Sequence, residues 1–253
     1  MRGRAALLLA LVPMLAVAAC SGGPGGGGGM RGNRRPPPMR PYAQPTNVIA
    51  AEIALARAAR ENGQWTALAE RAQPGAQIAW NGPPAPAAAW LAGRTAPATP
   101  DRWQAREAWT SCDGSAVVIA GVGHDAAGNW SRFTRVWERA GREFRWAVTV
   151  WQPDAELTAM RRAEAAQRSA DAEDDAITVE ALNAIRARTA PCPADRAPAT
   201  RDRDAGNPVT PGLARDNTLR WTADLVDPAA FTAWWQAADG WEQVHAQPVT
   251  GTR

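Results

Sequence analysis

The feature that most limits the fold is a run of four alternating segments in the middle of the chain. In these segments the hydrophobic pattern has a period of two, which is typical of β-strands. Glycine-containing turns such as Asp113-Gly114 and Ala140-Gly141 separate them. The segments are Trp103–Ser111, Ala116–Val122, Asn129–Glu138 and Phe144–Trp151. Short strands joined by tight turns predict an antiparallel meander.

The residues before the meander follow a helical pattern instead. Residues 47–61 separate into an apolar and a charged side, which predicts a helix that ends at Asn62-Gly63. Residues 64–71 predict a second short helix, and residues 76–80 a short strand. Residues 81–101 are rich in Pro, Ala and Gly, and we expect a long loop or a lid there.

This order of elements resembles the nuclear transport factor 2-like fold, and the local sequence resembles its SnoaL-like and DUF4440-type members. The resemblance covers residues 46–152 and rests on the stretches Ile49–Gly63, Ser111–Val118 and Phe133–Glu138. It implies an α+β fold in which a curved antiparallel sheet wraps around the first helix and leaves a cone-shaped cavity. In enzyme members, such as ketosteroid isomerase and polyketide cyclases, an acid or a histidine inside the cone moves a proton.

Glu107 is the candidate for such a catalytic group. Strand alternation places it on the same side as Trp103 and Trp109, where burial could raise the pKa of a carboxyl group. The alternative is a structural ion pair with Arg132 or Arg135. The single tyrosine, Tyr42, precedes the domain, so a tyrosine oxyanion site of the isomerase type is not expected.

The chain contains 13 Trp against three Phe and one Tyr, and tryptophan both builds cores and lines pockets. We expect a pocket lined by indole rings, with two arginines available for an anionic end of a ligand. The candidates are Trp65, Trp80, Trp90, Arg106, Trp109, Trp130, Arg132 and Trp146. The alternative is that the same rings fill the cone as an ordinary core.

The N-terminus carries a targeting signal. Arg2 and Arg4 precede an apolar stretch that ends in the run Leu15-Ala16-Val17-Ala18-Ala19-Cys20, which resembles the lipobox of bacterial lipoproteins. The resemblance implies cleavage before Cys20 and lipidation of its thiol and amine. Because Ser21 rather than Asp follows, it also implies an outer-membrane anchor facing the periplasm. The alternative is an ordinary secretory signal with a chance cysteine.

Cys112 and Cys192 remain once Cys20 is assigned to lipid. An even pair in an exported protein predicts one disulfide, with two buried free thiols as the alternative. His124 and His245 are the only histidines and lie far apart in sequence, so we expect no zinc site. The chain has no phosphate-binding or dinucleotide fingerprint, and we expect no cofactor.

The net charge of +3 comes from the N-terminus, because residues 1–40 hold six Arg and no acidic residue. The rest of the chain has 22 Arg against 25 Asp plus Glu, and this balance argues against nucleic-acid binding. The expected organisation is a signal peptide at 1–19, a Gly/Pro/Arg-rich tether at 20–45, the cone domain at 46–152, a polar helix and linker at 153–215, and a small three-stranded meander at 216–253.

Function at this stage rests on location and fold. The leading hypothesis is a lipid-anchored envelope protein with a non-catalytic cone that binds a small apolar ligand or serves as a scaffold. The alternatives are a SnoaL- or ketosteroid-isomerase-like enzyme that uses Glu107, and an envelope protein–protein interaction module. The face of the sheet could also serve a homodimer.

Overall fold

The structure is a computed structural model, and it describes residues 43–171, 184–192, 210–224 and 230–249. The signal peptide, Cys20 and most of the tether therefore lie outside the described residues. The elements in chain order are α1 (Pro45–Asn62), α2 (Gln64–Arg71), β1 (Ala72–Trp80), β2 (Ala85–Pro86), α3 (Ala87–Leu91), β3 (Arg102–Thr110), β4 (Ala116–His124), β5 (Trp130–Ala140), β6 (Glu143–Pro153), α4 (Ala155–Asp171), β7 (Arg186–Thr189), β8 (Thr210–Leu213), β9 (Leu219–Asp224), β10 (Ala230–Ala237) and β11 (Gly240–Pro248). None of the described helices is long and apolar enough to cross a membrane.

The larger sheet has seven strands in the order β2-β1-β6-β5-β4-β3-β7. Strands β3 to β6 form the expected antiparallel meander. The prediction of a wholly antiparallel sheet is wrong, because β1 pairs in parallel with β6 and β7 pairs in parallel with β3. Both additions join strands that are far apart in the chain, and no tight turn fixes their direction. The fold is therefore α+β with a mixed sheet.

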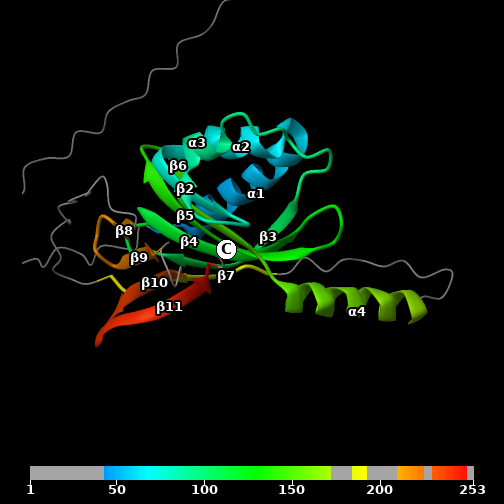
Figure 1. Cartoon of the computed structure of the whole chain (residues 1–253). Coiled ribbons are helices and arrows are strands. Elements are labelled where there is room, and N and C mark those ends of the chain that lie inside the picture. The colour runs from blue at the N-terminus through cyan, green and yellow to red at the C-terminus, as the bar shows by residue number, and fades with distance from the viewer. Residues whose placement is uncertain (1–42, 172–183, 193–209, 225–229, 250–253) are drawn as a thin grey trace, which may run out of the picture. The chain divides into compact units, whose positions relative to one another are not determined.

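Helices α1, α2 and α3 lie together on one face of this sheet (Figure 1). Helix α1 begins with a proline in its first turn, where the missing N–H costs no hydrogen bond. It ends at Asn62 and is followed by Gly63, whose positive φ of 94° suits glycine. Between these ends α1 buries one side, Val48, Glu52, Leu55, Ala56 and Ala59, against the sheet. Residues 81–101, expected as a loop or a lid, contain β2 and the short helix α3.

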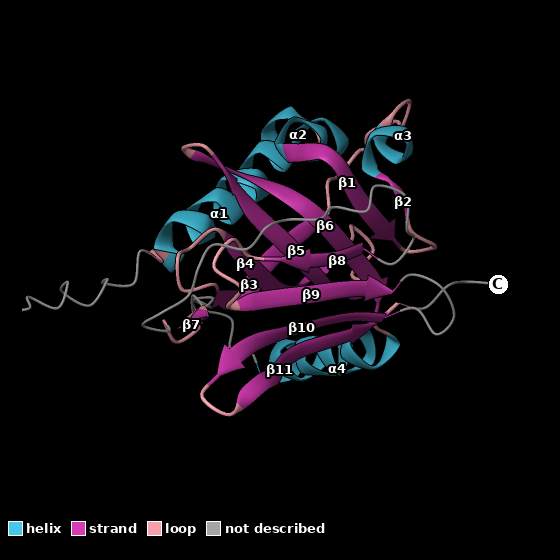
Figure 2. Cartoon of the chain, turned by 90° about the vertical axis from the view of Figure 1, so that its left-hand side faces the viewer, coloured by secondary structure: helices cyan, strands magenta, loops and turns pink. Residues whose placement is uncertain are grey.

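The second sheet covers the opposite face of the larger one (Figure 2). Its strands are antiparallel in the order β11-β10-β9-β8, so it has four strands where three were expected. Leu219, Trp221 and Phe231 belong to the same core cluster as Val118 and Val136 of the larger sheet. Strand β4 is apolar along its length because its alternate residues enter both cores, Val117 and Ile119 on the helix side and Val118 on the other.

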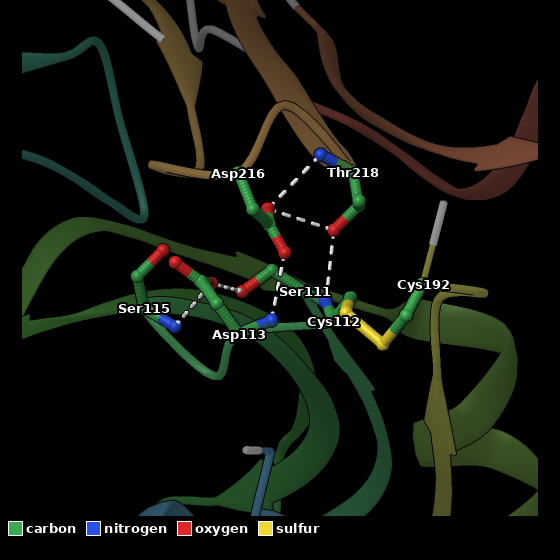
Figure 3. The surroundings of a disulfide bond; sticks show 7 residues. All are labelled: Ser111, Cys112, Asp113, Ser115, Cys192, Asp216 and Thr218. Atoms are coloured by element: carbon green, nitrogen blue, oxygen red, sulfur yellow. Dashed lines mark hydrogen bonds between the residues drawn. A yellow bond between two sulfur atoms is a disulfide. The ribbon is translucent and has the colours of Figure 1, made fainter. Parts of the chain in front are cut away.

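A disulfide fastens the turn between β3 and β4 to the segment after β7. Cys112 and Cys192 are bonded, with Cα atoms 5.2 Å apart, which confirms the predicted pair. The same turn is also held by the second sheet (Figure 3). The backbone N–H of Cys112 donates to Thr218 Oγ1 at 2.8 Å, and that of Asp113 donates to Asp216 Oδ2 at 2.7 Å. Three parts of the chain therefore meet at one turn.

Candidate functional site

The inside of the curved sheet is organised around a buried ion pair. Glu52 projects from α1, and its Oε1 lies 2.5 Å from Nη1 of Arg135 on β5. The two side chains are 2% and 0% exposed. Removing a charge pair this far from water is costly, and hydrogen bonds to its remaining donors and acceptors offset part of that cost. The surroundings of each partner therefore decide what this centre can do.

Two indoles complete the hydrogen bonding of the Glu52 carboxylate. Trp103 Nε1 donates to Oε1 at 2.8 Å, and Trp137 Nε1 donates to Oε2 at 2.7 Å. Arg135 in turn donates from Nε to Thr149 Oγ1 at 3.0 Å, and its guanidinium faces the rings of Trp103 and Phe133. Its Nη2 has no hydrogen-bond partner among the described residues. With three donors on it, the carboxylate is poorly placed to take a proton from a substrate.

Aromatic rings fill the space between this ion pair and helices α2 and α3. Trp151 stacks on Trp80 at 4.3 Å between ring centroids, and Phe133 stacks on its other side at 5.7 Å. Trp65 meets Trp80 edge-on at 5.3 Å. Gly123 makes the space that the Trp151 ring needs, because a Cβ there would lie 2.2 Å from the ring. The rings form a packed column, consistent with the hypothesis that they fill the cone.

Glu107 does not lie on the helix side of the larger sheet, where the aromatic rings are packed. A β-bulge between Ala105 and Glu107 reverses the alternation along β3, so Trp103 and Ala105 face the helices while Trp109 faces the second sheet. Glu107 pairs with Arg186 of β7, and its side chain is 29% exposed. The predicted partners are therefore wrong, since Arg135 pairs with Glu52 and Arg132 with Asp154.

The predicted pocket residues fall into two groups. Trp65, Trp80 and Trp90 meet at the helix end of the column, and Trp146 is buried below them with its Nε1 donating to the carbonyl of Leu68 at 2.9 Å. The others do not share a site with them, because strand alternation and the bulge turn them to the other face or to solvent. They are Trp109, Trp130, Arg106 and Arg132.

Two of these misplaced residues lie near α4. The ring of Trp130 faces the guanidinium of Arg161 on that helix at 5.1 Å. Partial burial, and then the charge of Arg161, lower the pKa of Arg106. Neither residue contributes to the aromatic column. Among the described residues no group of His, Cys, Asp or Glu could hold a metal ion.

No protein-family model and no curated protein matches this chain. The arrangement of the buried side chains and the sequence motifs are therefore the basis for the proposed function.

A second buried polar cluster lies between the two sheets. His245 of β11 stacks on Trp109 at 5.0 Å, and its Nε2 lies 2.7 Å from Thr134 Oγ1 of β5. The Thr134 hydroxyl donates to Gln247 Oε1 at 2.5 Å, so it accepts from a neutral His245 that is protonated at Nε2. Burial lowers the pKa of His245 to about 4, although the charge of Glu107 acts in the opposite direction.

We expect acid to loosen the second sheet through this histidine. The unfolded chain protonates His245 near pH 6.5 and the folded protein only near pH 4. The contribution of neutral His245 to the free energy of unfolding is therefore complete above pH 6.5. It is lost as the pH falls toward 4, and the full loss is about 3 kcal/mol. Urea unfolding between pH 7.5 and 4 measures this loss. His245→Gln should flatten the part of the slope between pH 6.5 and 4, and an unchanged slope would contradict the assignment.

Proposed function

We propose that this chain is a lipid-anchored cell-envelope protein whose nuclear transport factor 2-like domain is a non-catalytic scaffold. The anchor rests on the lipobox at Leu15–Cys20, and the Gly/Pro/Arg-rich segment that follows links it to the domain. Two observations support the likeness to the nuclear transport factor 2-like fold. Helix α1 lies on one face of the larger sheet (Figure 1), and the antiparallel meander β3–β6 follows it in the chain. An outer-membrane location facing the periplasm is part of the proposal.

The filled cone is the observation that carries the scaffold role. Its interior holds packed indoles and one buried carboxylate, Glu52, which already accepts hydrogen bonds from Arg135, Trp103 and Trp137. An enzyme of the SnoaL type needs an ionisable group that reaches a substrate in an open cavity. Glu107 lies on the other face of β3 and is paired with Arg186, so we do not propose it as a catalytic base.

The second sheet bears on the other hypotheses. It packs on the face of the larger sheet that a sheet-mediated homodimer would have used, so we do not propose that dimer. A small apolar ligand would have to displace rings at the helix end of the column, where Trp65 and Trp90 are only partly buried. We therefore favour a scaffold over a carrier of such ligands.

Cys20→Ala tests the anchor. Wild-type protein made in a bacterium that processes lipoproteins should fractionate with membranes, and its mass should correspond to a chain that starts at an acylated Cys20. The variant has no thiol to receive the lipid, so it should be released or keep its signal peptide. Ser21→Ala is the control and should behave as wild type. The proposal fails if wild type and Cys20→Ala associate equally with membranes and if the mass of the wild type shows no acyl groups on Cys20.

A further inference from the structure

A groove open to solvent lies between α1 and the hairpin that joins β5 to β6. Its volume is about 350 Å³. The wall on the side of α1 is made by Asn47, Ala50, Ala51 and Ala54, and the opposite wall by Arg139, Arg142, Glu143 and Phe144, with Arg71 of α2 completing the rim. The groove is thus lined by alanines and one phenyl ring together with three arginines, one glutamate and one asparagine.

Two of the arginines that line the groove are unpaired among the described residues. Arg71 and Arg142 are exposed, and neither makes a hydrogen bond or an ion pair within the described part of the chain. Glu143 lies 3.8 Å from Arg145, which offsets its charge. Arg139 is held in place, because its Nε donates to the carbonyl of Gly114 at 3.3 Å and its guanidinium faces the Phe144 ring. Guanidinium groups at a rim of this kind match a phosphate, which accepts two parallel N–H bonds.

Two further observations identify the occupant. Ile53 is 54% exposed on α1, one helical turn from Ala50, so an uncovered apolar residue lies next to the α1 wall of the groove. Asn47 lies in the first turn of α1, where the tether from Cys20 enters the domain. The scaling for a linker of about 22 residues gives a mean span of about 25 Å, so the proposed anchor would keep this end of α1 near the bilayer surface.

We propose that this groove binds the anionic headgroup of a phospholipid in the membrane to which the chain is anchored. Arg71 and Arg142 would donate to the phosphate, the alanines and Phe144 would contact the glycerol, and Ile53 would enter the interface between headgroups and acyl chains. A groove of about 350 Å³ suits a headgroup rather than a whole lipid. The inference rests on the lipid anchor of the proposed function, which explains why this end of the domain would face the bilayer.

Vesicle sedimentation tests the groove without the anchor. The complete mature chain carrying Cys20→Ser has no acyl group, so its binding reports the protein surface alone. With vesicles of phosphatidylcholine containing phosphatidylglycerol, Arg71→Gln/Arg142→Gln should weaken partitioning about 30-fold, since each arginine at an anionic surface accounts for roughly fivefold. The control Arg168→Gln/Arg188→Gln removes the same charge from α4 and β7 and should weaken it less than threefold.

An apolar pair of variants gives an independent readout. Ile53→Ser should weaken partitioning about tenfold, because part of its side chain would leave the interface. Met160→Ser on α4, where Met160 is 48% exposed, should leave partitioning unchanged. Equal losses for groove and control variants in both pairs would overturn the inference, as would tighter binding of inorganic phosphate than of the vesicles. Because the chain in this assay has no lipid, its failure leaves the result of the Cys20→Ala experiment unaffected.

Discussion

Replacing Glu52 with glutamine should lower the free energy of unfolding by about 3–5 kcal/mol. The change keeps the shape of the side chain but leaves the fully buried guanidinium of Arg135 without a counter-charge. It also turns an amide donor toward a site surrounded by the donors of Trp103 and Trp137. Urea or thermal unfolding followed by far-ultraviolet circular dichroism measures the loss.

Two controls separate burial from simple loss of charge. Glu107→Gln removes a carboxylate from the other ion pair, whose Arg186 side chain is 71% exposed, and should cost no more than about 1 kcal/mol. The double variant Glu52→Gln/Arg135→Met should recover much of the loss, because the uncompensated charge is then gone. Equal and small effects at Glu52 and Glu107 would mean that the Glu52 pair does not organise the core.

Removing the disulfide should cost a similar amount. The bond between Cys112 and Cys192 closes a loop over a sequence separation of 80, which corresponds to about 4–5 kcal/mol in the chain-entropy account. We expect Cys112→Ala/Cys192→Ala to lower the urea midpoint accordingly. Dithiothreitol should bring the wild-type protein down to the same midpoint and leave the double variant unchanged. A wild-type midpoint that does not respond to reduction would contradict the bond.

The order of helices and strands within residues 46–152 could be predicted, because each of these elements is encoded by its local sequence. The meander follows from alternation and from the turns at Asp113-Gly114 and Ala140-Gly141, and α1 follows from its apolar side. The disulfide followed from counting cysteines in a chain expected to be exported. The parallel neighbours β1 and β7 could not be predicted, because no turn links them to the strands they join.

The contents of the cone were harder to predict, for two reasons. The first is the bulge after Ala105, which depends on tertiary packing and turned Glu107 away from the tryptophans it was expected to join. The second is Glu52, a charged residue of the predicted helix 47–61 that belonged to none of the candidate sites. A signal was present, since Glu52 shares helical spacing with Val48, Leu55 and Ala59 and so lies on the buried side. A charge at such a position indicates a buried partner.

The exchange of indole N–H protons with solvent tests the filled cone most directly. In protein labelled with ¹⁵N at tryptophan, the indole protons of Trp103 and Trp137 are bonded to the buried Glu52 and should exchange only on a global opening. The indole of Trp65 donates to the carbonyl of Thr95 near the surface and should exchange far sooner. If all three exchange at the same fast rate, water reaches the inside of the sheet and the cone is open rather than filled.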